Sequence, residues 1–324
     1  MKRILVTEAV KGEAMSQLRN EADLEVIFEP DLWNDPAALK QAVAEADAII
    51  VRNQTQVTAE LIAAAPKLKI IARAGAGLDN IDTDAATAAG IVVSFAPSEN
   101  SLSVAELAIG LFISLARNIT SADKDIRKGN WNRALFTGSE LSGKTLGVVG
   151  IGRIGTLVAQ RAKAFGMNLI AHDKFADQSA SHYTELDVSF VELDELLAKA
   201  DFITVHLPLL PDTRKLFNQE RFAKMKSSAF FVNTSRGEVV DETALSEALD
   251  NGIIAGAGLD VREIEPPTAG DAIVQTDKAV LTPHIAAFTN EAQERVVAAV
   301  CRDSTAVLRG QAADGFFNFA EPKR

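Results

Sequence analysis

Short apolar runs rich in β-branched residues recur along the whole chain and alternate with segments of helical spacing. Five such runs come first, at residues 4–6, 24–27, 48–51, 69–72 and 91–93. Six more follow, at residues 146–149, 168–171, 202–205, 230–232, 258–259 and 280–281. Strands that alternate with helices are typical of parallel sheets covered on both faces. The pattern therefore predicts two α/β units in tandem.

Helix signals lie between the runs. Asp35 precedes a proline and predicts a capped helix start. Ser103 and Glu106 can cap each other's amides and predict the opening of a long helix between the two series. Residues 153–166 predict a helix from Thr156 to Phe165, and residues 290–309 predict a long helix that returns to the first unit.

The simplest architecture is two doubly wound parallel-sheet domains, one inserted into the other. We expect an α/β chain with a Rossmann domain over residues 100–287, inserted into a flavodoxin-like substrate domain over residues 1–99 and 288–324. At 324 residues the chain is long enough for two separate cores.

Composition narrows the class of protein. Hydrophobic residues make up 47% and charged residues 24%, as in ordinary globular proteins. A net charge of -11 would repel phosphate backbones and anionic lipid, so neither a nucleic acid nor a membrane is expected as a partner. The apolar run at residues 4–6 is too short for a signal peptide, and the single Cys301 cannot form an intrachain disulfide. We therefore expect a cytoplasmic protein, with no metal site.

A glycine motif follows the first run of the second series. Gly150 permits a tight turn, Gly152 lets the backbone approach a pyrophosphate, and Gly155 allows close packing of helix and strand. Such a pattern alone also fits an ordinary turn. Asp173, which ends the next run, is the independent second element, because its carboxylate can accept hydrogen bonds from a ribose and would repel a 2'-phosphate. The two together predict NAD as cofactor.

Three charged or titratable residues follow the later runs. Arg236 offers a planar fork for a carboxylate, and His284 titrates near neutrality, as removal of a hydroxyl proton requires. Glu265 would orient the histidine ring and favour its protonated form. A single histidine after a strand is more often structural, and spacing alone does not bring the three together.

Several ordered motifs resemble the D-isomer-specific 2-hydroxyacid dehydrogenases over residues 1–310. They include Arg73-Ala74-Gly75-Ala76-Gly77-Leu78-Asp79, Val205-His206-Leu207-Pro208, Asn233-Thr234-Ser235-Arg236-Gly237 and Thr282-Pro283-His284. The resemblance implies catalytic roles for Arg236, Glu265 and His284. It also implies cofactor contacts, which with the residues above give the set Gly150, Gly152, Arg153, Ile154, Gly155, Asp173, His206, Pro208, Thr234, Ser235, Arg236, Asp260, His284 and Ala286.

The resemblance also indicates a substrate. Amides of Gly75, Ala76 and Gly77 would hold its carboxylate, and Arg52, Arg73 and Arg133 would hold a second anionic group. Departures from the family's pattern are Asn53 in place of a small hydroxyl residue, Ala134-Leu135 in place of a more basic pair, and Arg262 in place of an aromatic residue.

The phosphoglycerate-oxidising members are the most similar, so oxidation of 3-phosphoglycerate to 3-phosphohydroxypyruvate is the leading expectation. A hydroxypyruvate or glyoxylate reductase and a sulfolactate dehydrogenase are alternatives of the same chemistry. An NAD-sensing, corepressor-like binding protein is the alternative from another class. A homodimer is expected from the resemblance. Because the chain ends at Arg324, feedback through a carboxy-terminal regulatory domain is not expected.

Overall fold

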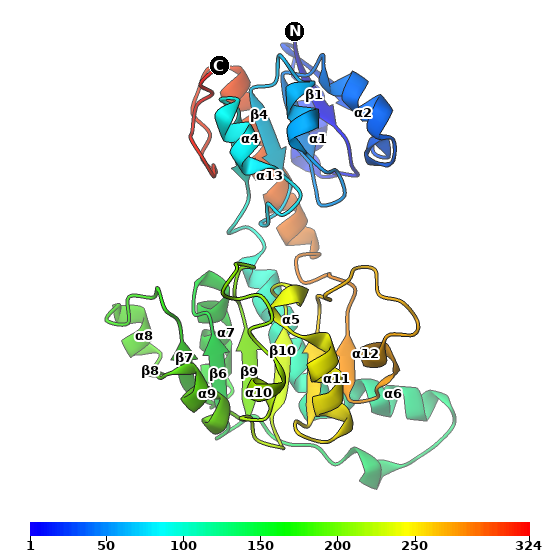
Figure 1. Cartoon of the computed structure of the whole chain (residues 1–324), viewed down its shortest axis with the longest axis vertical. Helices are drawn as coiled ribbons and strands as arrows, with labels where there is room; N and C mark the ends of the chain where they lie inside the picture. Colours follow the sequence, from blue (N-terminus) through cyan, green and yellow to red (C-terminus); the bar gives the residue numbers. More distant parts are fainter. The chain divides into compact units, whose positions relative to one another are not determined.

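A computed structural model describes residues 1–324, and the chain divides into two compact units. The first comprises Met1–Asn100 and Ala287–Arg324, and the second comprises Ser101–Ala286. Figure 1 shows both units, with many of their helices and strands labelled. Every strand pairing within the two sheets is parallel, which confirms the predicted doubly wound α/β class.

The first unit contains a five-stranded sheet in the order β2-β1-β3-β4-β5. This is the flavodoxin-like order. Its strands are β1 (Lys2–Val6), β2 (Leu24–Phe28), β3 (Ala48–Val51), β4 (Ile70–Arg73) and β5 (Val92–Phe95). Its helices are α1 (Glu13–Leu18), η1 (Leu32–Asn34), α2 (Pro36–Val43), α3 (Ala59–Ala63), α4 (Thr83–Ala88) and α13 (Asn290–Leu308).

Strand residues of the first unit alternate between two buried cores. Ile50 packs in the core on the side of α1 and α13, while its neighbour Ile49 packs with α2 and α3. Asp35 caps α2 as expected, since its carboxylate accepts hydrogen bonds from the amides of Ala37 and Ala38. Because helices cover both faces of the sheet, the strands appear in the sequence as continuous apolar runs.

The second unit contains a seven-stranded sheet in the order β12-β11-β10-β9-β6-β7-β8. Its strands are β6 (Thr145–Val149), β7 (Asn168–His172), β8 (Val188–Phe190), β9 (Phe202–Val205), β10 (Phe230–Asn233), β11 (Gly256–Leu259) and β12 (Ala279–Leu281). Its helices are α5 (Ser101–Ala116), α6 (Ile119–Arg127), η2 (Arg133–Phe136), α7 (Arg153–Ala164), α8 (Ser181–Glu185), α9 (Leu193–Lys199), α10 (Gln219–Phe222), η3 (Gly237–Val239), α11 (Glu242–Asp250) and α12 (Ala272–Gln275). The strand order is the Rossmann order with one added strand.

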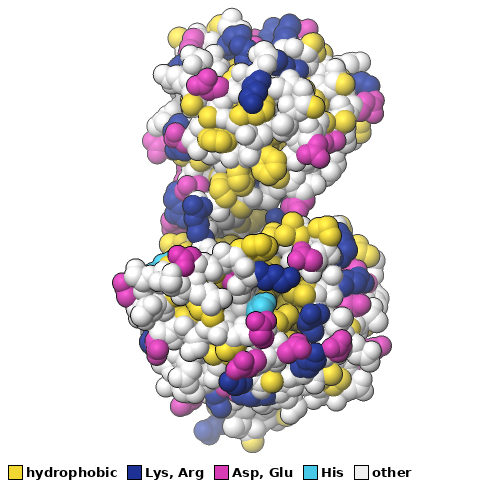
Figure 2. Space-filling view, turned by 60° about the vertical axis from the view of Figure 1, so that its left-hand side comes forward, with side chains coloured by type: hydrophobic (Ala, Val, Ile, Leu, Met, Phe, Trp, Pro, Cys, Tyr) yellow, Lys and Arg dark blue, Asp and Glu magenta, His cyan; other side chains and the backbone are white.

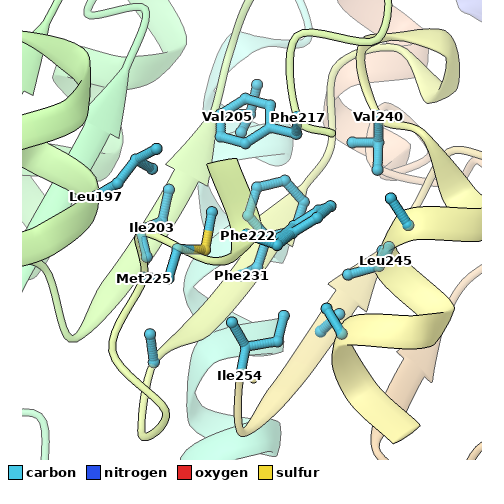
Figure 3. Close-up of a cluster of buried hydrophobic side chains, with 14 of the residues drawn as sticks. Leu197, Ile203, Val205, Phe217, Phe222, Met225, Phe231, Val240, Leu245 and Ile254 are labelled. Carbon is cyan, nitrogen blue, oxygen red and sulfur yellow. The ribbon is translucent and has the colours of Figure 1, made fainter. Parts of the chain in front are cut away.

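Aromatic side chains dominate the core on one face of this second sheet. Phe217, Phe222 and Phe231 pack together, with ring centroids 4.9 Å apart for Phe217 and Phe231 and 5.5 Å apart for Phe222 and Phe231. Figure 3 shows this cluster, in which Leu245 of α11 also takes part. On the opposite face α5 and α7 cover the sheet. The core fixes the strand ends that carry the polar residues described below.

Helix boundaries depart from the prediction at two places. The helix α5 begins at Ser101, so Ser103 lies inside it and the predicted capping pair with Glu106 is wrong as a helix start. The helix α7 begins at Arg153, three residues before the predicted start, because Gly152 already serves as its N-cap. No single helix is long and apolar enough to cross a membrane; α5 and α6 reach such a length only as a pair bent by 61°.

Candidate active site

The glycine turn lies between the two central strands of the second sheet. A Cβ atom at Gly150, whose φ is +86°, would stand 2.6 Å from the carbonyl oxygen of His206 beyond β9. At Gly155 it would stand 2.3 Å from the carbonyl oxygen of Gly150. Both positions therefore require glycine. Since β6 and β9 are adjacent while β7 lies on the other side of β6, the turn occupies the point where the strand order reverses.

Gly152 is different, because a Cβ atom there would meet nothing within 4 Å. It caps α7 without a side-chain hydrogen bond, so open space lies beside the positive end of a 12-residue helix. Nearby strand ends carry further polar groups: the Thr234 hydroxyl is buried without a partner, and so is Nδ1 of His206. Burial lowers the pKa of His206 to about 3, so its ring is neutral. The open space at the start of α7 can hold a phosphate, and the unpaired polar atoms of Thr234 and His206 lie at neighbouring strand ends. This arrangement fits a bound dinucleotide.

Asp173 follows β7 and already has a structural task. Its Oδ2 accepts the amide of Ile151 at 2.9 Å, which fixes the glycine turn. Its Oδ1 accepts the amides of Phe175 at 2.8 Å and Ala176 at 3.1 Å. Each carboxylate oxygen has two lone pairs, so the group retains acceptor capacity for a ribose. The predicted ribose contact remains a proposal.

The three predicted catalytic residues follow three neighbouring strands. Arg236 comes after β10, Glu265 after β11 and His284 after β12, and these strands are adjacent in the sheet. His284 Nδ1 lies 2.8 Å from Oε2 of Glu265. Arg236 is close enough for its charge to act on both residues. The second unit by itself thus brings together side chains separated by about fifty positions in sequence.

Electrostatics prepare this pair for proton transfer. The hydrogen bond that His284 donates to Glu265 raises the pKa of His284. Burial opposes this rise, the charges of Glu265 and Asp260 add to it, and the charge of Arg236 lowers the pKa. Burial alone would raise the pKa of Glu265, but hydrogen bonds from His284 and the Arg262 amide and the charge of Arg236 lower it. Glu265 is therefore a carboxylate near neutral pH, and the imidazole holds its proton more firmly than a free one.

The backbone of His284 is held in an unusual conformation. Its φ is +56°, which few residues other than glycine adopt. Asp260, only 1% exposed, supports it. The Asp260 carbonyl accepts the amide of His284 at 2.8 Å, and its carboxylate accepts the amides of Ile285 at 2.9 Å and Ala286 at 2.8 Å. The Thr282 hydroxyl donates to the same carboxylate at 2.6 Å. Asp260 thus orients the segment that carries His284.

Replacing Asp260 with alanine should lower the free energy of unfolding by about 3 kcal/mol, because buried amides lose a charged acceptor. Urea denaturation measures the change, and Asp277→Ala, at an exposed position of the same unit, is the control and should stay within about 0.5 kcal/mol of the wild type. Equal stability of the two variants would mean that Asp260 does not anchor the loop.

Some of the predicted substrate residues belong to the first unit. The Arg52 guanidinium donates to Oε1 of Gln293 at 2.7 Å and lies 5.1 Å from the ring centroid of Phe288. A Cβ atom at Gly75 would lie 1.7 Å from Nη1 of Arg73, so Arg73 packs against the glycine loop. The amide of Gly75 already donates to the Arg73 carbonyl at 2.8 Å, which leaves the amides of Ala76 and Gly77 as the candidates for binding a carboxylate. Arg133, in η2 of the second unit, is exposed.

Comparison with known proteins decides the family. Residues 109–286 match the family model of the D-isomer specific 2-hydroxyacid dehydrogenase, NAD binding domain. The chain belongs to the D-isomer specific 2-hydroxyacid dehydrogenases. The predicted family is thereby confirmed, and so is NAD binding as the property of its second domain.

Individual relatives of this dehydrogenase chain carry different names. It is 44% identical over 95% of its length to D-3-phosphoglycerate dehydrogenase 2, chloroplastic, of Arabidopsis thaliana, and covers 49% of that protein. It is 46% identical over 91% of its length to the hydroxypyruvate reductase of Thermotoga maritima, and covers 94% of it. The chain spans 49% to 57% of the length of the first curated relatives it matches.

A solved structure of the family also matches the whole chain. D-lactate dehydrogenase from Aquifex aeolicus, complexed with NAD and lactic acid, superposes with a TM-score of 0.86 at 28% identity. The match covers 98% of this chain and 99% of that one. The fold predicted from the sequence is therefore the fold of the family.

Two residues that hold the predicted substrate loop of the first unit were not among the predicted site residues. Glu8, only 2% exposed, follows β1 and accepts the amides of Arg52 at 2.7 Å and Thr55 at 3.0 Å. Asn80 donates to the carbonyls of Arg52 at 2.9 Å and Thr55 at 2.7 Å. Together they fix the loop that carries Arg52. The position of Glu8, two residues after the end of β1, was the available signal, since the ends of strands line ligand sites in parallel sheets.

Proposed function

We propose that the chain is an NAD-dependent dehydrogenase that oxidises a small 2-hydroxy acid, with 3-phosphoglycerate as the substrate and 3-phosphohydroxypyruvate as the product. The observation that carries the chemistry is the hydrogen-bonded pair of His284 and Glu265 beside Arg236. The pair lies at the carboxyl edge of a sheet whose glycine turn fits a dinucleotide.

His284, Glu265 and Arg236 each have a proposed role in the reaction. NAD, when bound, supplies the acceptor for the hydride that leaves C2 of the substrate. Because Nδ1 of His284 is engaged by Glu265, Nε2 is the atom that takes the proton of the hydroxyl group. Glu265 stabilises the imidazolium that results. Arg236 binds the carboxylate and polarises the reacting oxygen through its planar fork.

We propose that three arginines bind the phosphate of the substrate. Arg52, Arg73 and Arg133 are the proposed ligands of this group, and the amides of Ala76 and Gly77 are proposed to hold the carboxylate. In the first unit the loop that bears Arg52 is already fixed by Glu8 and Asn80, so the cation would be ordered before the substrate arrives. The name of the relative from Arabidopsis thaliana supports the phosphorylated substrate.

Hydroxypyruvate reduction is the second candidate, and a specific observation favours it. The relative from Thermotoga maritima is 46% identical, and this chain covers 94% of its length. An NAD-sensing binding protein is the less supported alternative, because sensing alone does not need an ordered acid–base pair.

Steady-state rates separate these candidates. We expect the highest kcat/KM for 3-phosphoglycerate with NAD when it is compared with glycerate, sulfolactate, glyoxylate and hydroxypyruvate, each with the matching form of NAD and of NADP. A preference for an unphosphorylated acid would remove the specific substrate while leaving the reaction class in place. The absence of turnover with every acid would favour the sensor.

Partners and location follow the same proposal. We propose a homodimer in the cytoplasm that acts on small molecules and binds neither nucleic acid nor membrane. The net charge of -11, and the mixture of acidic and basic side chains on the face shown in Figure 2, support only the expectation that neither nucleic acid nor an anionic membrane is bound. The single cysteine, Cys301, is buried and fits a reducing compartment.

A further inference from the structure

Arg262 is a buried arginine next to the catalytic residues, and the proposed reaction does not use it. It lies two residues beyond Asp260 and is only 7% exposed. A buried cation is costly unless other groups compensate its charge. The family resemblance led us to expect an aromatic residue at this position, so the buried charge of Arg262 departs from that expectation.

The side chain of Arg262 connects three segments of the second unit. Its Nε lies 3.0 Å from Oε1 of Glu242 and its Nη2 lies 2.8 Å from Oε2, a two-pronged pairing. The same Nη2 lies 3.6 Å from Oδ2 of Asp271. Glu242 begins α11 and Asp271 is the N-cap of α12. Arg262 and Asp271 flank the segment 263–270. The guanidinium of Arg262 therefore links both ends of this segment to the start of α11.

The backbone of the same residue holds the catalytic carboxylate. The amide of Arg262 donates to Oε1 of Glu265 at 2.9 Å, while Oε2 of Glu265 receives His284 Nδ1 at 2.8 Å. The amide of Glu263 donates to Oε1 of Glu242 at 2.6 Å, so the peptide on either side of residue 262 is fixed. Beyond it the loop is exposed, with Ile264 70% exposed. Glu265 thus depends on residue 262 for its position.

The backbone of Arg262 packs closely against the loop that carries Arg236. A Cβ atom at Gly237 would lie 1.9 Å from the carbonyl oxygen of Arg262. The residue directly after Arg236 therefore touches the backbone that holds Glu265. A displacement of residue 262 would disturb two of the three catalytic side chains.

Other charged groups around these residues have their own partners. Lys215 Nζ lies 3.0 Å from Oε1 of Glu263 and 3.7 Å from Oδ2 of Asp241. The charged groups that act on His284 are Glu265, Asp260 and Arg236. Arg262 is not among them, so its influence on the histidine must pass through the position of Glu265.

We propose that Arg262 is a positioning residue: its ion pair with Glu242 fixes the amide that holds Glu265 against His284. The inference rests on the proposed function for its catalytic meaning, but the geometry it asserts can be measured without turnover. A merely structural role would change the stability of the loop and leave the protonation of His284 as it is.

Histidine titration by NMR tests this directly. The chain has four histidines, and the His284 signal is assigned by its absence from His284→Ala. We expect the pKa of His284 in Arg262→Gln to fall close to its value in Glu265→Gln, because in both variants the carboxylate no longer faces the ring. Arg262→Lys should restore part of the shift, since lysine keeps the charge without the fork.

A matched control breaks an ion pair elsewhere in the same unit. Lys226 lies 2.9 Å from Asp201, at the amino edge of the same sheet, so Lys226→Gln should leave the pKa of His284 unchanged. If Arg262→Gln does not fold, Glu242→Gln breaks the same pair and carries the same expectation. An unchanged pKa in either folded variant, beside a lowered one in Glu265→Gln, would overturn the inference.

Activity adds the second readout. In Arg262→Gln, kcat for the hydroxy acid should fall about tenfold at neutral pH while KM for NAD stays near the wild-type value. The pKa of His284 could fall in this variant while the wild-type protein turns over no hydroxy acid. That result would support the positioning role and reject the proposed function. Wild-type kcat in Arg262→Gln would reject the role in catalysis.

Discussion

His284→Ala should lower turnover by about a hundredfold or more while the affinity for NAD stays close to that of the wild type. We propose that the imidazole takes the hydroxyl proton, and its Nδ1 is already engaged by Glu265. Without it the proton must leave to water, whereas the glycine turn of Gly150, Gly152 and Gly155 is untouched.

Steady-state kinetics and a fluorescence titration with NADH measure the two halves of this expectation. His182→Ala is the control, because His182 is exposed on α8 and this substitution should leave turnover unchanged.

The rate of oxidation should depend on pH in a defined direction. Oxidation needs neutral His284, whose pKa is raised, so the rate should rise as pH passes through that raised value. Wild-type turnover in His284→Ala would exclude the assigned role.

Arg236→Gln should lower kcat/KM for the hydroxy acid by about a hundredfold, equivalent to about 3 kcal/mol of transition-state stabilisation. The variant loses the cation that we propose as the ligand of the substrate carboxylate. Arg236→Lys keeps the charge but loses the planar fork, so it should recover only part of the loss.

Measurement of kcat and KM separately shows where the loss falls. Most of it should appear as a raised KM for the acid together with a lowered kcat, because Arg236 is proposed to contact both the carboxylate and the reacting oxygen. Arg161→Lys, at the far end of α7 from the glycine turn, is the matched control and should behave as the wild type. Equal kcat/KM in Arg236→Gln and the wild type would remove Arg236 from the site.

Much of the fold could be predicted because both faces of each sheet are covered. Eleven of the twelve strands begin or end within two residues of a predicted apolar run. The strand β8 was missed because its three residues, Val188, Ser189 and Phe190, are too few to show a period. The start of α5 was misplaced because serine is common at helix starts, yet Ser103 lies inside this helix, two residues after its first residue.

The candidate site could be predicted as residue types at strand ends, but its supports could not. Arg236, Glu265 and His284 follow strands in a sheet whose carboxyl edge binds ligands, which is a rule of topology. Asp260 and Arg262 are different. Their tasks depend on which amide or carboxylate each meets in the folded unit, such as Glu242 twenty positions away from Arg262. No spacing rule encodes such a pairing.

We propose that hydride moves from C2 of a 2-hydroxy acid to NAD under the control of His284, Glu265 and Arg236. The most direct test uses 3-phosphoglycerate deuterated at C2, with NMR of the cofactor after turnover. We expect reduced cofactor with the deuterium at C4 of the nicotinamide ring. Deuterium released to water, or no reduced cofactor from any 2-hydroxy acid, would contradict it.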